Sequence, residues 1–403
     1  MVSTAETIKS TRFHDFVVTV EGEGVAPGQP VSVEQTRHKF LFGTSAFWLT
    51  TRLPTEVRAT LEDRFLALFN AATLPFYWGR YEPEEGKPAE AITRQAALWC
   101  REHGIVTKGH PLCWHTVCAD WLMAYDTPTI LDKQMARITR EVTGFRGLID
   151  MWDVINEVVI MPVFDKYDNA VTRMANYLGA VELTLRVFER AREANPEATL
   201  LINDFDLSPA YEALIEELLE RGCPIDAIGL QTHQHQGYRG AETITDVIDR
   251  FAKFGKPLHF TENTLVSGHL MPADIVDLND YQVKAWPTTP EGEARQLAEV
   301  EEMTSLIYAR PEVAALIWWD MVDGGWLGAP AGLIRQDLTP KPAYLRLQEL
   351  TKGEWWFGET ALTLDARRQV RLRAPEGQYR LRVGSRDVTF SLDRAVPALA
   401  LAL

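Results

Sequence analysis

Long apolar segments are missing from this 403-residue sequence. No run of 18 or more apolar residues occurs, so no membrane-spanning helix is predicted. The first residues, MVSTAETIKSTRFHDF, lack the apolar centre of a signal peptide. We therefore expect a cytoplasmic protein with no membrane partner, or a secreted one if a leader sequence has been removed.

Basic residues are also fewer than acidic ones. Lys and Arg together number 41 against 56 Asp and Glu, which gives a formal net charge of −15. Such a charge repels phosphate backbones and anionic membranes, so nucleic acid is excluded as an expected partner. A neutral or cationic substrate suits this charge better.

Cysteine is scarce, and its spacing predicts no disulfide framework. The chain has four cysteines and no CxxC pair, so we expect free thiols. Cys113 and Cys118 flank a candidate site loop, and we interpret both as small packing residues.

What the sequence does contain is a regular alternation of short apolar runs and amphipathic stretches between about residues 40 and 350. The eight apolar runs lie at residues 39–47, 71–78, 105–114, 148–157, 198–205, 225–233, 257–263 and 313–323. Segments of helical period lie between them, for example residues 55–69, 91–104, 172–194, 243–255 and 291–310. Eight strands, each followed by a helix, predict the α/β class and a closed (β/α)8 TIM barrel. A doubly wound open sheet is the alternative, but no run leads into a Gly-rich phosphate turn.

The two ends of the chain have a different pattern. Residues 11–36 and 359–403 alternate polar and apolar residues between turn signals, as half-buried antiparallel strands do. We therefore divide the chain into an N-terminal β segment (1–38), a catalytic barrel (39–352) and a C-terminal β segment (353–403). The two β segments are expected to form one small accessory β-sandwich-like region. Because both chain ends must meet to build it, we favour a structural cap over a carbohydrate-binding module.

Polar side chains and tryptophans recur where the predicted strands end, which is the catalytic face of such a barrel. In chain order they are Trp78, Arg80, His110, Trp114, His115, Asn156, Glu157, Asn203, Asp204, Asp206, Gln231, His233, His235, Glu262, Asn263, Trp318, Trp319, Asp320, Asp323 and Trp326. Flat aromatic faces stack on sugar rings, and His, Asn and Gln bind sugar hydroxyls. The set therefore favours a carbohydrate site.

Two of these residues, Glu157 and Glu262, each end an apolar strand, the fourth and the seventh. The two strands lie nearly across the barrel from each other, so the carboxyls can act as a pair. A separation of about 5 to 5.5 Å lets one carboxyl attack an anomeric carbon while the other protonates the leaving oxygen. A separation of roughly 6.5 to 9.5 Å leaves room for an inverting water instead.

Two other kinds of protein compete with this interpretation. A metal-dependent hydrolase would use His233 and His235, with His110, His115 and either Asp204 or Asp320 as further ligands. A non-catalytic carbohydrate-binding barrel would have no need of an acid and a nucleophile on opposite strands. We expect no metal and no cofactor.

Seven segments carry a more specific resemblance. In order and spacing, the chain resembles glycoside hydrolase family 10, the endo-β-1,4-xylanases, over the barrel. The segments are GHPLCWH (109–115), WDVINE (152–157), NDF (203–205), GLQTH (229–233), HFTEN (259–263), WWDMVDGGW (318–326) and KPAY (341–344). The resemblance implies hydrolysis of β-1,4-xylosidic bonds in xylan or xylo-oligosaccharides.

The resemblance also implies a role for each matching residue in a retaining double displacement. Glu157 would be the acid/base and Glu262 the nucleophile. Asn156 would hold the sugar 2-hydroxyl, and His233 would orient Glu262. The remaining implied substrate-binding residues are Gln231 and His110 at the attacked sugar, Trp319 and Trp326 as its platform and cap, and Trp114 beside them.

The segment after the second strand departs from the family pattern. An ENxMKW-like stretch is usual there, but this chain has LPFYWGRYEPEEG, two residues shorter, with Tyr77, Trp78 and Arg80 as candidate substrate-binding residues. Arg80 would either bind the carboxylate of a glucuronyl branch or pair with Glu82 or Glu84.

Two further departures lie at later strands, where TEN replaces TELD after the seventh strand and WD replaces WG after the eighth. All of these changes lie on the substrate side of the site. Another β-glycan, or exo-action on a decorated oligosaccharide, therefore stays open.

Overall fold

The computed structural model describes residues 3–403, and its centre is a closed parallel barrel. The barrel order is β10-β3-β4-β5-β6-β7-β8-β9. The strand bounds are β3 (Leu41–Ser45), β4 (Ala71–Pro75), β5 (Val106–His110), β6 (Met151–Asn156), β7 (Thr199–Asp204), β8 (Ala227–Gln234), β9 (Leu258–Leu265) and β10 (Val313–Trp318). Each of the eight predicted apolar runs overlaps one barrel strand, so the predicted (β/α)8 barrel is confirmed.

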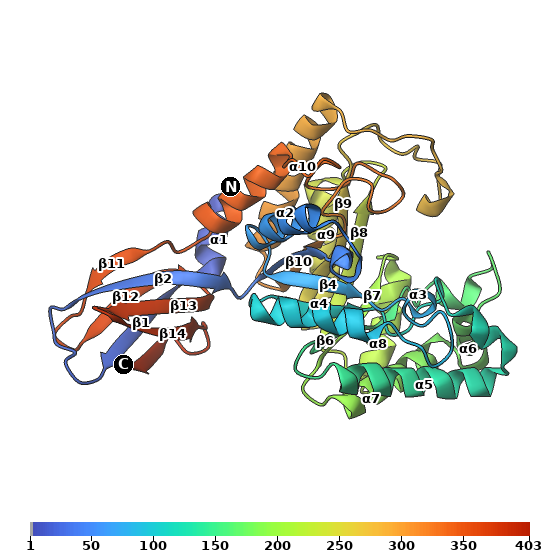
Figure 1. The fold of residues 1–403 in the computed structure, drawn as a ribbon, viewed down its shortest axis with the longest axis horizontal. Coiled ribbons are helices and arrows are strands. Elements are labelled where there is room, and N and C mark those ends of the chain that lie inside the picture. The colour runs from blue at the N-terminus through green and yellow to red at the C-terminus, as the bar shows by residue number, and fades with distance from the viewer. Residues whose placement is uncertain (1–2) are drawn as a thin grey trace.

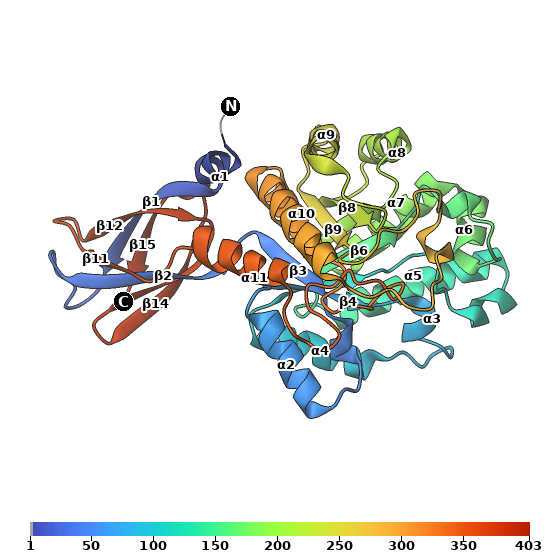
Figure 2. The ribbon, with the colours of Figure 1, turned by 90° about the horizontal axis from the view of Figure 1, so that it is seen from above.

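Helices surround the barrel, as Figures 1 and 2 show. They are α2 (Thr55–Leu66), α3 (Trp78–Tyr81), α4 (Glu90–Glu102), α5 (Thr127–Gly144), α6 (Ala170–Leu178), α7 (Ala180–Ala194), α8 (Pro209–Glu220), α9 (Gly240–Ala252), α10 (Pro290–Ala309) and α11 (Pro342–Glu349). Short 3-10 turns lie at η1 (Phe47–Thr50), η2 (Asp120–Ala124), η3 (Met161–Val163) and η4 (Leu278–Asp280), and a π-turn at η5 (Leu350–Glu354). Helix residues such as Phe188 and Ile248 share one apolar cluster with strand residues such as Val154 and Ile228. This burial fixes the register of the strands, because a shift by one residue would turn buried apolar side chains away from the helices.

Three predicted segments differ from the elements observed. The expected helix at residues 172–194 is two helices, because Gly179 adopts φ +84° between α6 and α7. The third and eighth apolar runs continue past the ends of β5 and β10, so Trp114 and Trp319 lie on loops. All four cysteines are free, and no helix within residues 3–403 is long and apolar enough to cross a membrane.

Two small sheets stand beside the barrel and are built from both ends of the chain (Figure 1). One has the order β12-β1-β15 and the other β11-β2-β13-β14. Their strands are β1 (Phe13–Glu21), β2 (Pro30–His38), β11 (Thr360–Thr363), β12 (Gln369–Pro375), β13 (Gly377–Val383), β14 (Arg386–Leu392) and β15 (Ala398–Ala402). Side chains of both sheets, such as Val18 and Leu381, form one buried cluster apart from the barrel core. The predicted accessory β region of the two ends is thus present, whereas the domain boundaries and its role as a cap remain predictions.

A helix that the sequence pattern did not indicate precedes β1. The segment α1 (Thr4–Arg12) begins with a capping box between Ser3 and Glu6 and packs against α10. Arg12 donates to the carbonyl oxygens of Tyr308, Arg310 and Val313 at 2.5 to 2.8 Å. These bonds satisfy carbonyl groups at the C-terminal end of α10 and connect the accessory sheets to the amino-terminal end of the barrel.

Candidate active site

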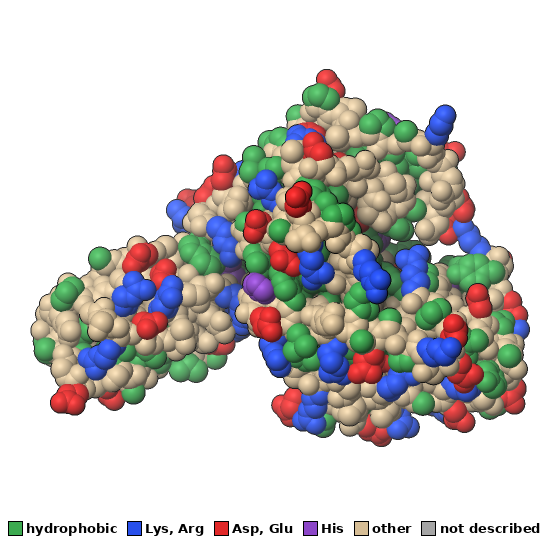
Figure 3. Space-filling view, viewed as in Figure 1, with side chains coloured by type: hydrophobic (Ala, Val, Ile, Leu, Met, Phe, Trp, Pro, Cys, Tyr) green, Lys and Arg blue, Asp and Glu red, His purple; other side chains and the backbone are tan. Residues whose placement is uncertain are grey.

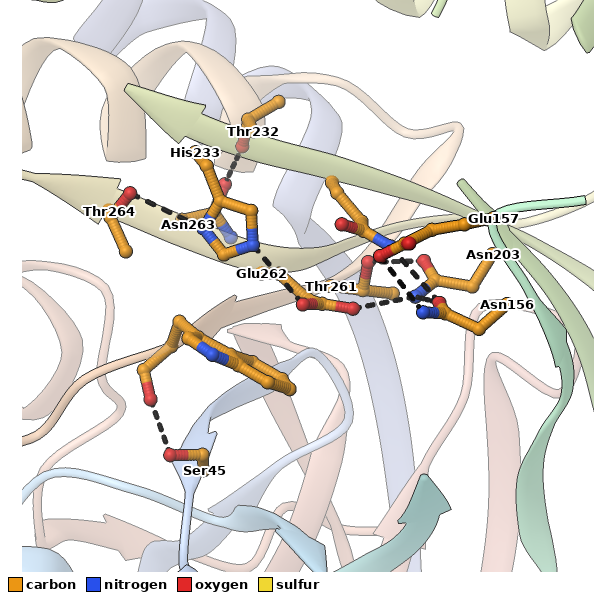
Figure 4. Close-up of polar contacts among 12 residues, drawn as sticks. Ser45, Asn156, Glu157, Asn203, Thr232, His233, Thr261, Glu262, Asn263 and Thr264 are labelled. Carbon is orange, nitrogen blue, oxygen red and sulfur yellow. Dashed lines mark hydrogen bonds and ion pairs between the residues drawn. The ribbon is translucent and has the colours of Figure 1, made fainter. Parts of the chain in front are cut away.

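Two amide side chains connect Glu157 and Glu262 at the carboxyl ends of the strands (Figure 4). Asn203 Nδ2 donates to Glu262 Oε1 at 2.8 Å and to Asn156 Oδ1 at 2.7 Å. Asn156 Nδ2 in turn lies 3.1 Å from Glu157 Oε1. Gly229 leaves the space that Asn203 occupies, because a Cβ there would lie 2.4 Å from Asn203 Oδ1. The predicted pair of carboxyls therefore shares one hydrogen-bond network.

Glu157 follows β6 directly and is held in an uncommon backbone conformation. Its φ is +57°, a region that non-glycine residues rarely occupy and that clusters at functional sites. Its N–H donates to the carbonyl oxygen of Asn203 at 2.8 Å. Trp114 Nε1 donates to Glu157 Oε2 at 2.7 Å, and Gln231 Nε2 lies 3.4 Å from Oε1. The carboxyl is thus aimed by its backbone and by its neighbours.

The environment of Glu157 favours its protonated form. Burial, followed by the nearby charge of Glu262, raises the pKa of Glu157 to about 8, against the opposing effect of the Trp114 hydrogen bond. Near pH 7 this carboxyl is therefore mainly neutral and can donate a proton.

The environment of Glu262 favours its charged form. Burial alone would raise the pKa of Glu262, but the charge of His110 and the hydrogen bond of His233 outweigh it and lower the pKa. His233 Nε2 lies 3.2 Å from Glu262 Oε2, and His110 Nε2 lies 3.9 Å from Oε1. Glu262 is 4% exposed, so these contacts act with little screening by solvent.

A buried ion pair behind His110 escaped the sequence analysis. Asp153 Oδ2 lies 2.7 Å from His110 Nδ1 and 2.7 Å from Lys108 Nζ, and Asp153 is fully buried. Burial opposes the charge on Asp153, but Lys108 and His110 outweigh it and lower the pKa of Asp153. Because a carboxylate only accepts, His110 donates through Nδ1 and its ring is oriented. Lys108 and His110 lie two residues apart on one face of β5, which was the available signal.

A cavity of about 350 Å³ adjoins these carboxyls (Figure 3 shows the hollow at this end of the barrel). Five predicted site residues line it, namely Tyr77, Arg80, Trp114, Trp319 and Trp326, with Ser45, Phe47, Trp48, Val117, Asn279, Asp320, Met321, Val322 and Gly325. A larger hollow of about 620 Å³ lies at the other end of the barrel, near Arg12 and Glu376, and contains none of the predicted site residues. The smaller cavity is the one beside the two carboxyls, since its wall includes Trp114, the donor to Glu157.

The wall of this cavity carries a buried acid, Asp320. It is 5% exposed, and its Oδ2 accepts from the Trp326 N–H at 3.3 Å. Burial raises the pKa of Asp320 to about 8, so near pH 7 the group is mainly neutral. A neutral carboxyl both donates and accepts, which suits it to a sugar hydroxyl.

The structure does not bring Trp78 to the cavity, which corrects its assignment as a substrate-binding residue. Trp78 is buried in the first turn of α3, under the guanidinium of Arg137, and its Nε1 donates to Glu82 Oε2 at 3.1 Å. Trp78 therefore packs beneath the segment that follows β4, on the side away from the cavity. Its neighbour Tyr77 instead faces His110 and Trp114, with ring centroids 5.6 and 5.3 Å away.

Arg80 lies exposed on the cavity wall, with its guanidinium 5.8 Å from the centre of the Tyr77 ring. Within residues 3–403 it forms no ion pair. The two expected partners are engaged elsewhere, Glu82 with Arg140 and Glu84 with Lys87. The alternative of a plain salt bridge is therefore not observed.

The two histidines of the competing metal hypothesis have ring centroids 6.1 Å apart and make different contacts. His233 turns to Glu262, whereas His235 packs against Trp326 and Trp286, with centroids 5.1 and 6.0 Å away. Within residues 3–403, no group of three or more His, Cys, Asp or Glu side chains has the arrangement of a metal site.

Comparison with known protein families gives a match over most of the barrel. The sequence model of glycosyl hydrolase family 10 matches residues 59–350, which is more than half of the chain. The chain belongs to glycosyl hydrolase family 10. The resemblance inferred from the strand-end motifs is thereby confirmed.

Two curated relatives come from Xylanibacter ruminicola. An endo-1,4-beta-xylanase/feruloyl esterase is 29% identical over 230 residues, 50% of this chain and 32% of that protein. Endo-1,4-beta-xylanase A is 27% identical over 269 residues, 63% of this chain and 70% of that protein. The chain thus spans about a third of the first relative's length.

Solved structures of the family share the fold. A GH10 structure from Paenibacillus barcinonensis has a TM-score of 0.65 at 22% identity, covering 78% of this chain and 96% of that one. Native xylanase 10B from Thermotoga maritima has a TM-score of 0.62 at 23% identity, covering 78% and 95%.

Proposed function

We propose that this family 10 chain hydrolyses β-1,4-xylosidic bonds in xylan or xylo-oligosaccharides with retention of anomeric configuration. The observation that carries the proposal is the unequal pair of carboxyls in one network, with the pKa of Glu157 raised and that of Glu262 lowered. Two carboxyls whose pKa values are shifted in opposite directions are typical of an acid and a nucleophile. The names of the xylanase relatives support the choice of substrate.

In the first step, a carboxylate oxygen of Glu262 attacks the anomeric carbon. Glu157 gives its proton to the glycosidic oxygen, the bond between that oxygen and the anomeric carbon breaks, and the leaving chain departs as an alcohol. The product is a glycosyl ester of Glu262. The hydrogen bond from Asn203 and the contact with His233 hold the attacking carboxylate in place.

In the second step, Glu157 acts as the base. Once Glu262 is an ester it carries no charge, so one of the causes that raise the pKa of Glu157 is removed. The Glu157 carboxylate then takes a proton from water, whose oxygen attacks the anomeric carbon and releases Glu262. The electrostatic coupling of the two carboxyls therefore adjusts Glu157 to both of its roles.

The other residues of the network position the sugar and the carboxyls. Asn156 is fixed by Asn203 and by Gln231, whose Nε2 donates to Asn156 Oδ1 at 3.0 Å. Its amide group is therefore available at a fixed place for the 2-hydroxyl of the attacked sugar. Trp319 and Trp326 supply apolar walls for the sugar ring.

The decisive experiment replaces the proposed nucleophile. Glu262→Gln should lower turnover of xylo-oligosaccharides by roughly 10⁴-fold or more while substrate binding persists. Glu212→Gln, which alters a carboxyl on α8 paired with Arg250 and Lys253, serves as the matched control and should retain turnover. NMR of the wild-type reaction should detect the β-anomer first. Unchanged turnover in Glu262→Gln, or the α-anomer first, would contradict the assignment.

Substrate choice is tested by product analysis. Wild-type enzyme is given xylan, a mixed-linkage glucan and aryl xylosides, and the expected order of kcat/KM places the xylose-based substrates first. A preference for the glucan would leave the proposed mechanism intact and change the proposed substrate from xylan to another β-glycan.

A further inference from the structure

The segment that follows β9 is a folded element and extends beyond the barrel mouth. This roof segment, residues 266–289, carries its own apolar cluster with the loop after β10, formed by Val266, Met271, Trp286, Ala329 and Ala331 with Ile275, Leu278, Tyr281 and Leu327 packed on it. Gln236 Nε2 also donates to the carbonyl oxygens of Pro272 and Ile275 at 2.9 and 2.8 Å. Figures 1 and 2 show it reaching from the α10 side toward the loop before α6.

The roof segment is joined by an ion pair to the loop after β6. Lys166 Nζ lies 2.6 Å from Asp277 Oδ2 and 2.7 Å from Asp280 Oδ1. The two joined loops follow the strands that position Glu157 and Glu262. In the barrel order, β7 and β8 separate these strands on one side, and β5, β4, β3 and β10 separate them on the other. The contact therefore divides the barrel mouth into two parts.

Residues beside this contact reach the active site. Asn279, between the two aspartates, lines the cavity together with Tyr77 and Arg80. Tyr167, next to Lys166, packs against Phe164 with ring centroids 4.9 Å apart, and Phe164 packs against His115 at 4.5 Å, beside Trp114 of the cavity wall. The connection thus passes over the catalytic cavity and does not run outside it.

We propose that the contact of Lys166 with Asp277 and Asp280 closes the barrel mouth above the catalytic carboxyls and selects short xylo-oligosaccharides and chain ends over the interior of a long polymer. The inference rests on the proposed function. A chain lying across the mouth has to pass this connection, whereas a short chain enters from the cavity side.

The closure is weak enough to open. All three side chains are substantially exposed, at 43%, 34% and 63%, and exposed ion pairs contribute little to stability. Salt screens such pairs, so the opening should increase with ionic strength. The polymer is therefore slowed and not fully excluded.

The test compares two substrates for one variant. For Lys166→Ala, the ratio of kcat/KM on polymeric xylan to kcat/KM on xylotetraose should rise about threefold or more, with the tetraose value within about twofold of wild type. Asp277→Asn combined with Asp280→Asn removes the same contact from the other side and should give the same rise. Lys166→Arg, which keeps the charge, should restore the wild-type ratio.

Salt and a distant ion pair provide the controls. Added salt should raise the ratio in wild type and leave that of Lys166→Ala unchanged. Lys253→Ala breaks the ion pair of an exposed lysine with Glu212, away from the mouth, and should not change the ratio. An unchanged ratio in both contact variants, or an equal loss on both substrates, would overturn the closure while the proposed function stands. A wild type inactive on both substrates would overturn the proposed function and this inference with it.

Discussion

The floor and the rim of the active site are built in different ways. The floor comprises side chains at the ends of β5 to β9, namely His110, Asp153, Asn156, Glu157, Asn203, Gln231, His233 and Glu262, and most of these side chains form a hydrogen bond with another member. The rim comprises side chains of the segments that follow the barrel strands, namely Tyr77, Arg80, Asn279, Trp319, Asp320 and Trp326, which face a cavity. Hydrogen bonds between strand ends fix the chemistry, whereas loops vary the substrate. Reaction and specificity should therefore be separable by mutation.

The largest expected effect lies on the floor, at Glu157. Glu157→Gln removes the proton donor, so kcat/KM on xylo-oligosaccharides should fall by roughly 10²- to 10⁴-fold. For aryl xylosides with good leaving groups, kcat/KM should fall far less, because they need no proton. Wild-type activity should decline above about pH 8, where Glu157 loses its proton, and at low pH as Glu262 gains one below its ordinary pKa of 4.5.

The pH profile of the variant is the sharper measurement. The basic limb should disappear for aryl xylosides in Glu157→Gln, while the acidic limb of Glu262 stays. A basic limb that persists in this variant would assign it to another group and remove Glu157 as the acid.

The same substitution should stabilise the fold at alkaline pH. Burial raises the pKa of Glu157 from 4.5 to about 8, so between these values the folded state binds more protons than the unfolded state. The free energy of unfolding therefore falls as pH rises through this window. Glu157→Gln removes that loss and should raise the free energy of unfolding by roughly 4 kcal/mol at pH 8 relative to wild type, with little difference near pH 4.

Chemical denaturation at both pH values measures this effect. Asp226→Asn, which alters a half-exposed carboxylate outside the floor, controls for loss of a negative charge. Equal free energies of unfolding for wild type and Glu157→Gln at pH 8 would contradict a raised pKa of Glu157 in the folded state.

The sequence predicted the floor better than the rim, for a physical reason. Floor residues end apolar strands, and the parallel barrel brings strand ends together, so Glu157, Glu262 and Gln231 could be named from strand patterns alone. Lys108 was missed because its spacing to His110 on one face of β5 does not indicate its partner Asp153, 45 residues later.

Rim residues depend on loop conformation, which local patterns do not specify. Tyr77 and Trp78 are neighbours, but Trp78 begins the helical turn of α3. Tyr77 precedes the helix with a non-helical ψ of 113°, so its side chain leaves the backbone in a different direction from that of Trp78. Tyr77 therefore faces the cavity, whereas Trp78 faces the core. The contact of Lys166 with Asp277 joins residues more than 100 positions apart and leaves no periodic signal. Such features become visible only when the loops are placed in three dimensions.

The smallest expected effect lies on the rim, at Arg80. Its guanidinium is exposed on the cavity wall with no carboxylate partner within residues 3–403, so a uronic acid branch on the substrate can supply one. Arg80→Met keeps much of the aliphatic stem and should lower kcat/KM about fivefold on glucuronyl-substituted xylo-oligosaccharides, since exposed charge pairs are weak. Undecorated oligosaccharides should change less than about twofold, and Arg58→Met, which alters an arginine on α2 paired with Glu62, should affect neither. A loss of the same size on both substrates would place Arg80 with the floor, because it would then serve every substrate and not select among them.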